Sequence, residues 1–186
     1  QYVMSGQAVS LFSISYPNYQ LVTGIADELV ETSTNNGDGT WTYTVPITQG
    51  YEWSDGSAIT ANDMVFTYNT AKDLGLLSNW ETSYPQGSGT DSAADGYAQG
   101  ILTLVATDDY TVQITLNFDA GLASWQYQIA QAPILPASYW AQHATDRETL
   151  LAASGADAPV ASAFVYDKIE QGAFYTWAYD ANTMWD

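Results

Sequence analysis

The sequence contains no cysteine among its 186 residues. Disulfide bonds, thiolate nucleophiles and cysteine-ligated metals are therefore excluded, although this absence does not decide the cellular compartment. The single histidine, His143, has no partners at a metal-ligand spacing, so we expect no zinc site and assign no metal-binding residues. The chain also has no Gly-rich phosphate loop and no Gly-x-Ser-x-Gly motif, and we expect no cofactor.

Basic residues are almost as scarce. Three of them, Lys72, Arg147 and Lys168, stand against 21 acidic residues, which gives a formal net charge of −18. Phosphate binding requires cations, so nucleic acid is excluded as a partner and an anionic membrane surface is disfavoured. Only 13% of the residues are charged, so most of the surface must be neutral and polar, which suits a protein outside the cytoplasm. No apolar run is long enough to span a bilayer, and no signal peptide is visible.

The chain is nevertheless built to fold, because 46% of its residues are hydrophobic. Its most informative stretch is residues 50–68. There, Trp53 is followed by Ser54, Asp55 and Gly56, which predict a tight turn, since Asp bonds its own backbone and Gly accepts positive φ. Thr60 and Asp63 have the spacing of a capping box. They predict a helix from Ala61 to about Leu74, with an apolar stripe of Met64, Val65, Tyr68 and Ala71.

Further turns and periodic patterns predict three hairpins and several short helices. The hairpins are expected over residues 31–47, with a turn at 35–39; over 101–116, turned at Asp108-Asp109; and over 163–179, joined at 170–172. The helices are expected as one or two turns within 6–16, from a cap at Asp119 to about Ala130, from Pro136 through Trp140, and from a second capping box at residues 145–148 to about Ser154. Residues 75–100 read as irregular, with a flexible loop over 86–92. These patterns predict a fold that combines helices and strands.

The stretch 50–68 also carries a resemblance to a known family. Trp53, Ser54, Asp55, Gly56, Thr60, Ala61, Asp63, Phe66 and Tyr68 match the segment W-S-D-G-x-x-x-T-A-x-D-V-x-F-x-Y of the family 5 extracellular solute-binding proteins, with Met64 in place of the usual Val. Those are the dipeptide-, oligopeptide-, nickel- and oligosaccharide-binding proteins of ABC importers. Residues 101–116 resemble the family's I-x-x-V-x-x-x-D-D-Y-T-V-x-I-x-L pair of strands. At residues 162–164, Ser-Ala-Phe replaces the family's Gly-Pro-Tyr.

The resemblance implies an α/β fold with mixed sheets, in the form of a periplasmic-binding-protein-like clamshell. This chain would be part of one lobe, with the second lobe missing. It implies that residues 1–30 are a segment of the first lobe, 31–160 an inserted subdomain carrying the Trp-Ser-Asp-Gly motif, and 161–186 a hairpin returning to the first lobe. The chain would then be a fragment, or a shortened relative, of an extracellular, cell-surface or periplasmic binding protein. It would bind a peptide or oligosaccharide without catalysis and signal to a membrane ABC permease. The alternative is a structural protein that assembles on a surface, because a lobe with open strand edges favours self-association.

Several residues have more than one interpretation. Asp55 and Asp63 form a carboxylate pair of the kind glycosidases use, but turn and cap roles account for both. The run Asn36-Gly37-Asp38-Gly39 resembles half of a calcium loop and lacks the closing acidic residue, so a hairpin turn is the better interpretation, with Ca²⁺ binding left open. Aromatic rings line many sugar and peptide clefts. Those expected near loops or on helix surfaces are the candidate ligand contacts: Trp80, Tyr84, Trp125 and Tyr127.

Overall fold

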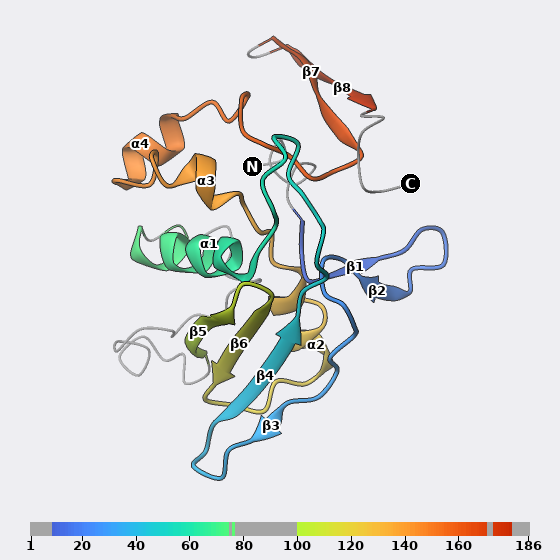
Figure 1. Cartoon of the computed structure of the whole chain (residues 1–186), viewed down its shortest axis with the longest axis vertical. Coiled ribbons are helices and arrows are strands. Elements are labelled where there is room, and N and C mark those ends of the chain that lie inside the picture. Colours follow the sequence, from blue (N-terminus) through green and yellow to red (C-terminus); the bar gives the residue numbers. More distant parts are fainter. Residues whose placement is uncertain (1–8, 75, 77–99, 171–172, 180–186) are drawn as a thin grey trace.

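A computed structural model of the chain describes residues 9–74, 76, 100–170 and 173–179. The lower half of the molecule in Figure 1 holds a four-stranded antiparallel sheet in the order β3-β4-β6-β5. The strands are β3 (Thr34–Asn35), β4 (Trp41–Pro46), β5 (Ile101–Asp108) and β6 (Thr111–Leu116). The predicted hairpins over 31–47 and 101–116 are thus confirmed as strand pairs, and β4 and β6 join them.

Strands β4 and β6 bury one face of the sheet by alternation of their side chains. In the β4–β6 pair, Tyr43 faces Ile114 and Val45 faces Val112, and all four side chains are buried. The opposite face carries Thr42 and Thr115, whose hydroxyl oxygens lie 3.0 Å apart. This is the period of two expected from a half-solvated antiparallel sheet.

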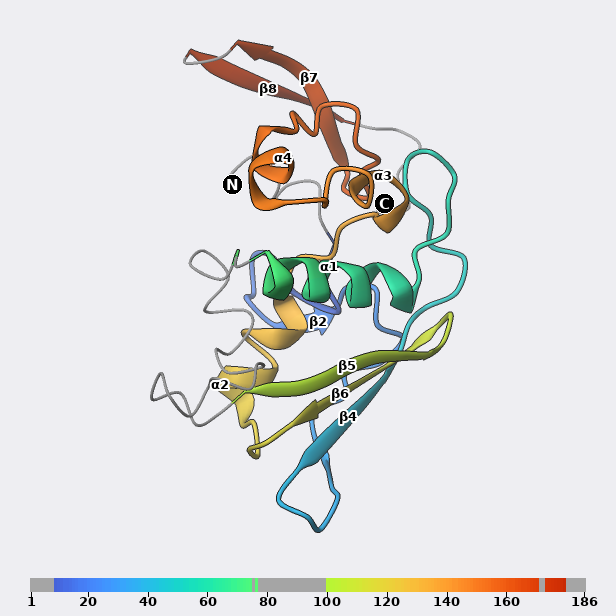
Figure 2. The same ribbon diagram turned by 90° about the vertical axis from the view of Figure 1, so that its left-hand side faces the viewer.

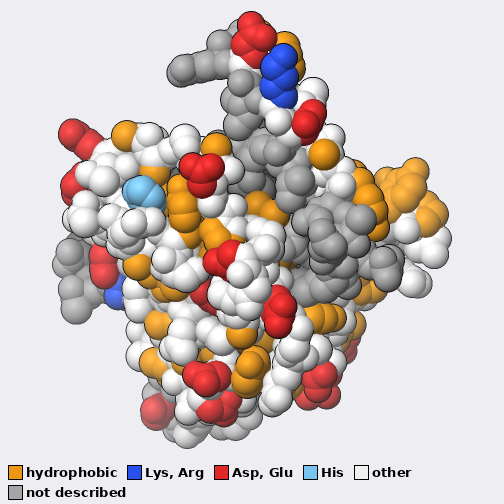
Figure 3. Space-filling model, turned by 45° about the horizontal axis from the view of Figure 1, so that its top comes forward, with side chains coloured by type: hydrophobic (Ala, Val, Ile, Leu, Met, Phe, Trp, Pro, Cys, Tyr) orange, Lys and Arg blue, Asp and Glu red, His pale blue; other side chains and the backbone are white. Residues whose placement is uncertain are grey.

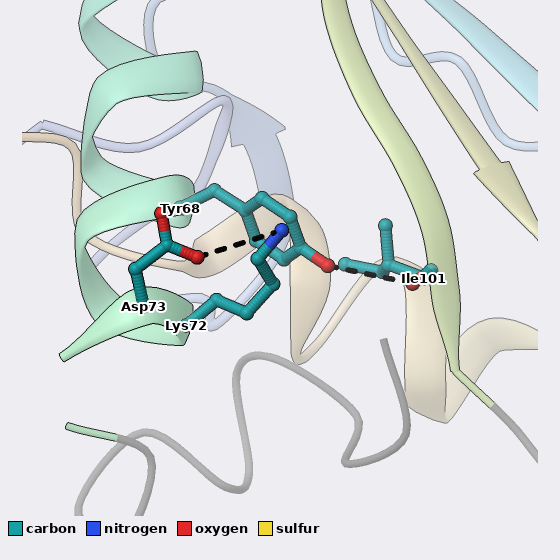
Figure 4. A network of polar contacts seen from close by, with 4 residues as sticks. All are labelled: Tyr68, Lys72, Asp73 and Ile101. Atoms are coloured by element: carbon teal, nitrogen blue, oxygen red, sulfur yellow. Dashed lines mark hydrogen bonds and ion pairs between the residues drawn. The ribbon is translucent and has the colours of Figure 1, made fainter. Parts of the chain in front are cut away.

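Helix α1 (Ala61–Asp73) covers the sheet at β5 and β6, as Figure 2 shows. Met64, Tyr68 and Ala71 are buried, which confirms the predicted stripe, and Val65 packs partly buried against the core. In Figure 4, the hydroxyl of Tyr68 donates to the carbonyl oxygen of Ile101 at 3.4 Å and ties the helix to β5. No helix within the described residues has the length and apolar character of a membrane span.

The remaining elements surround this unit. A small hairpin, β1 (Phe12–Ile14) with β2 (Leu21–Thr23), lies beside the sheet. Beyond α1 come α3 (Ala137–Trp140) and α4 (Arg147–Ala152), and a hairpin of β7 (Phe164–Glu170) and β8 (Phe174–Tyr179) projects at the far end of the molecule (Figures 1 and 2). The predicted third hairpin is therefore confirmed.

The prediction of a helix within residues 6–16 was wrong over its described part. Phe12–Ile14 is a strand, and Val9 forms an isolated bridge with Ile134. The carbonyl oxygens of Ser10 and Leu11 accept bonds from the amides of Ile25 and Gly24 at 2.9 and 2.7 Å. These long-range bonds occupy the carbonyls that a helix would need, so tertiary pairing overrides local preference.

The helices after the sheet were predicted too long. Instead of one helix from Asp119 to Ala130, the chain forms α2 (Leu122–Trp125), a turn, and the 3₁₀ helix η3 (Ile129–Gln131). Gly121, not Asp119, stands at the N-cap of α2, and the non-helical backbone of Gln128 (φ −126°, ψ −75°) separates the two pieces. Because of this break, the side chains of Trp125, Ile129 and Ala130 all point into the core, where they are fully buried.

Two cap positions and one turn also differ from the prediction. Asp146, not Thr145, caps α4, because its carboxylate accepts from the amide of Thr149 at 2.8 Å, and the helix ends at Ala152. Pro136 stands at the N-cap of α3 rather than in its first turn. The β5–β6 turn lies at residues 109–110, one position later than predicted. The irregular stretch predicted over 75–100 lies almost wholly outside the described residues.

Candidate ligand-binding site

A pocket of about 240 Å³ opens between the β1–β2 hairpin and the segment that leads into β7. The two walls are far apart in the sequence and are brought together only by the fold. The lining residues are Val9, Ser10, Ser13, Gly24, Ala161, Ser162 and Ala163. All of them are small or apolar, and the hydroxyls of the serines are the only polar side-chain groups among them.

The first wall depends on a close approach at Gly24. A Cβ atom at this position would lie 2.1 Å from the carbonyl oxygen of Ser10 and 3.1 Å from that of Leu11. Atoms do not approach so closely without a shift of the backbone, so this position requires glycine for space rather than for an unusual φ. The hydroxyl of Ser10 is held by a 2.6 Å bond to the carbonyl oxygen of Phe12.

The second wall is a segment without helix or strand, and side chains hold it. The amide of Val160 donates to Ser54 Oγ at 3.0 Å, and the amide of Ser54 donates to the carbonyl oxygen of Val160 at 2.8 Å. Ser162 Oγ donates to the carbonyl oxygen of Phe164 at 2.5 Å and accepts from the Phe164 amide at 3.1 Å. Ala161 is 5% exposed and belongs to the main core, so the wall is anchored on its inner side.

The electrostatics of the pocket are neutral. None of the lining residues carries a charge, and the three basic side chains contact other groups. Lys72 lies 3.7 Å from Asp73, Arg147 donates to the carbonyl oxygen of Leu74 at 3.4 Å, and Lys168 lies over the ring of Phe174 at 5.4 Å. On the face seen in Figure 3, acidic side chains are spread in separate groups and basic ones are sparse. A ligand carboxylate therefore finds no counter-charge among the lining residues.

The Trp-Ser-Asp-Gly motif has the structural role that the sequence predicts. Gly56 has φ of 81°, and Asp55 Oδ1 accepts from the amide and hydroxyl of Ser57 at 3.0 and 2.6 Å. These bonds lower the pKa of Asp55 below its usual value, and the bond from the hydroxyl of Ser57 has the largest effect. Both partners of the predicted capping box are in place, and the amide of Thr60 donates to Asp63 Oδ2 at 2.9 Å. The amide of Asp63 lies 3.1 Å from the backbone carbonyl oxygen of Thr60.

The predicted aromatic contacts fall in three different places. Trp125 is fully buried and stacks on Tyr43, with ring centroids 3.8 Å apart and an interplanar angle of 16°, so its predicted place on a helix surface was wrong. Tyr127 is 41% exposed and is not among the residues that line the pocket. Trp80 and Tyr84 lie outside the described residues.

The possible metal residues have structural contacts. The ring of His143 lies 5.1 Å from that of Tyr139 and 6.1 Å from that of Trp140. In the predicted turn, Gly37 and Gly39 have φ of 81° and 87°, and Asp38 Oδ1 accepts from the hydroxyl and amide of Thr40. These bonds lower the pKa of Asp38. The described part of the chain contains no group of three or more His, Asp or Glu side chains placed to hold a metal ion.

Sequence reasoning missed the pocket itself. Its lining residues lie in two segments more than 130 positions apart, and small neutral side chains give no local signal. The one residue connected with the pocket that the sequence singled out was Ser54. The motif placed it in a turn but did not show that it bonds to Val160. The bonds from Ser54 to Val160 depend on the tertiary fold and are visible only in the structure.

Solved structures with the same fold come from several bacteria. The periplasmic oligopeptide-binding protein of an oligopeptide ABC transporter from Thermotoga maritima, solved with mannohexaose, is 17% identical with a TM-score of 0.66, over 95% of this chain and 28% of that one. NikZ from Campylobacter jejuni, in complex with Ni(L-His), is 15% identical with a TM-score of 0.66, over 99% and 32%. DppA from Helicobacter pylori, in complex with the peptide STSA, is 17% identical with a TM-score of 0.63, over 98% and 35%.

This chain therefore spans about a third of the length of these structures. A comparison with curated protein sequences finds no match. The family model described as bacterial extracellular solute-binding proteins, family 5 Middle, matches residues 22–185, which is most of the chain. The resemblance carried by the Trp-Ser-Asp-Gly segment is thus confirmed, and the chain belongs to family 5 of the bacterial extracellular solute-binding proteins.

Proposed function

We propose that the chain provides part of the ligand-binding lobe of an extracytoplasmic solute-binding component of an ABC importer. The pocket between the β1–β2 hairpin and residues 161–163 contributes one side of the cleft, and the ligand is a peptide or an oligosaccharide held without covalent chemistry. A membrane permease of the importer is the partner that receives it. The division of the chain into residues 1–30, 31–160 and 161–186 is part of the same proposal.

The observation that carries this proposal is the uncharged, hydroxyl-bearing pocket in a chain of this family. Ligand pockets are concave, largely apolar and supplied with a few polar groups that fix orientation. The pocket fits that description, and neutral parts of a ligand, such as a sugar ring or a small peptide side chain, match its lining. The family's role is binding rather than catalysis, and the carboxylates of Asp55 and Asp63 are committed to a turn and a cap.

The exposed ring of Tyr127 is a second proposed ligand contact, together with Trp80 and Tyr84. Aromatic faces bind sugars and apolar side chains once both are desolvated. Trp125 is fully buried and offers no free face in this structure.

Isothermal titration calorimetry tests this function. The probes are mannohexaose, the tetrapeptide STSA and a nickel–histidine complex, the ligands of the three related structures. We expect saturable binding of mannohexaose or the tetrapeptide, and changed tryptophan fluorescence at the same stoichiometry. No heat and no fluorescence change with either of these two would reject the proposal for this chain.

A structural, self-associating protein is the second candidate function. In the described residues, β7 and β8 pair only with each other, and Phe164, Phe174 and Tyr179 are 51%, 44% and 59% exposed. Open strand edges with exposed aromatic rings pair readily with another chain. Light scattering at neutral pH distinguishes the candidates: multimers support assembly, and a strictly monomeric protein rejects it.

A further inference from the structure

We propose that Ser54 is a positioning residue for the pocket, which it shapes by fixing the backbone of Val160 next to the 161–163 wall. This inference rests on the proposed function, since it assigns that wall a part in ligand binding. It gives the Trp-Ser-Asp-Gly turn a task beyond its own local structure.

The wall has little structure of its own. Residues 159–163 form neither helix nor strand, so no ladder of backbone bonds holds them. Val160 is 5% exposed and has both of its backbone polar groups bonded to Ser54, a residue 106 positions earlier. Ala161, the first residue of the wall, follows directly. The two bonds that fix the backbone of Val160 therefore also fix the beginning of the wall.

Ser54 is itself fixed by the turn and by α1. The amide of Trp53 donates to the carbonyl oxygen of Ser57, and the amide of Gly56 donates to that of Trp53, both at 2.8 Å. The ring of Trp53 is 2% exposed, and its indole nitrogen donates to Asp63 Oδ2 at 3.3 Å. A continuous series of bonds thus runs from the first turn of α1 through Trp53 and Ser54 to the pocket.

The hydroxyl is the part that serine adds. Ser54 Oγ is the acceptor for the amide of Val160, whereas the second bond uses only the backbone of Ser54. Removing Oγ leaves that amide without this acceptor and allows residues 160–163 more conformations. A ligand must then pay the entropy of ordering the wall when it binds, which lowers affinity.

Three variants separate positioning from general stability. Ser54→Ala removes the acceptor, and Ser54→Thr restores a hydroxyl at the same position. Ser57→Ala is the matched control, because Ser57 lies in the same turn and its hydroxyl donates to Asp55, at 2.6 Å, rather than to the wall. Ser57→Ala removes one hydroxyl bond from the same turn, but it leaves the backbone bonds that fix Ser54 and the contact with Val160 in place.

Amide hydrogen exchange, followed by NMR on the whole chain, measures how well the backbone of the 161–163 wall is protected in the absence of ligand. We expect Ser54→Ala to speed exchange at residues 160–164 by about tenfold, the effect of losing one part-buried hydrogen bond. Ser54→Thr should restore most of the protection, and Ser57→Ala should leave these residues unchanged. Equal exchange in Ser54→Ala and wild type would overturn the proposal.

The affinity for mannohexaose and STSA, measured by calorimetry, then tests whether the order of the wall matters for ligand binding. Ser54→Ala should weaken binding by about three- to tenfold, in line with one hydrogen bond, with recovery in Ser54→Thr and none of this loss in Ser57→Ala. Faster exchange with unchanged affinity would overturn the positioning role and leave the proposed function intact. A wild-type chain that binds neither probe would reject the proposed function itself, and this positioning role with it.

Discussion

The indole nitrogen of Trp53 donates a hydrogen bond to Asp63 Oδ2 across 3.3 Å in the interior of the protein. The same carboxylate accepts from the amide of Thr60 at 2.9 Å and, through Oδ1, from the amide of Ala137 at 2.8 Å. One buried side chain therefore joins the turn, the start of α1 and the start of α3. This junction explains Trp53 and Asp63 of the family motif, because each contributes a side chain to its bonds, whereas Thr60 contributes its backbone amide.

The substitution Asp63→Asn tests that junction. Asparagine has one acceptor oxygen where the carboxylate has two, and its amide group would face a backbone or indole donor. We expect the free energy of unfolding to fall by about 2–3 kcal/mol, because bonds to a charged acceptor are strong and an unpaired buried donor is costly. Urea unfolding followed by circular dichroism measures the change.

Asp73→Asn is the control at the other end of the same helix. The side chain of Asp73 is 66% exposed and lies 3.7 Å from Lys72 on the surface (Figure 4). An exposed pair of this kind contributes little, so we expect a change within about 0.5 kcal/mol. Equal losses in the two variants would contradict a special role for Asp63.

Gly24→Ala tests the close approach at the pocket. The new Cβ would lie 2.1 Å from the backbone oxygen of Ser10, so the β1–β2 hairpin must move. We expect a loss of about 3 kcal/mol or more, at the upper end of the usual cost of overpacking, since backbone yields less than a side chain. Differential scanning calorimetry should show a fall in Tm of roughly 6–12 °C for a chain of this size.

Gly121→Ala is the matched glycine control. A Cβ at Gly121 meets no atom within 4 Å, and its φ of −73° suits any residue. Because Gly121 is the N-cap of α2, we expect a small loss of at most about 1 kcal/mol. A Gly24→Ala protein as stable as this control would show that the approach at Ser10 relaxes easily.

The buried hydroxyl of Tyr43 predicts a loss of stability in alkali. Burial raises the pKa of Tyr43; a hydrogen bond with Ser33 lowers it to a smaller extent, and the charge of Asp119 adds the least, a further rise. Folding therefore favours the neutral phenol. Its contribution to stability is complete below the pKa of the unfolded chain, about 10, and is lost as the pH rises through the higher folded value.

Tyr43→Phe should reduce that alkaline loss. At pH 8 the variant should be less stable by about 1 kcal/mol, because the 2.6 Å bond to the carbonyl oxygen of Ala120 is gone. Urea unfolding at pH 8 and at pH 10.5–11 should then show a smaller decline for the variant than for wild type. Tyr16→Phe, at an 85% exposed position, is the control and should decline like wild type.

Features set by neighbouring residues could be predicted from the sequence. The turn at Asp55 and Gly56, the capping box at Thr60 and Asp63, and the alternation along β4 and β6 all depend on contacts within a few positions or on simple periodicity. Their residues also match a long family motif, so local chemistry and resemblance agree. The antiparallel sheet and α1 followed from these signals.

Features set by distant partners could not be predicted. Phe12 lies in a strand because Thr23 pairs with it, and Trp125 is buried because Tyr43 offers it a stacking face. Thr145 and Asp146 are adjacent and both are good N-cap residues, so the sequence does not decide between them. The helix starts at Arg147, which makes Asp146 the cap. The pocket, with walls from residues 9–24 and 161–163, is the extreme case of long-range placement.

The net charge of −18 predicts a stability that depends on salt. At pH 7 the acidic side chains repel one another over a Debye length of about 30 Å in 0.01 M salt, but only about 3 Å in 1 M salt. We expect Tm to rise by several degrees over this range, measured by differential scanning calorimetry in NaCl. The same series at pH 4.1, the isoelectric point, is the control, since net repulsion vanishes there while effects of NaCl on apolar surface remain. An equal rise at both pH values would mean that self-repulsion does not limit the stability of this protein.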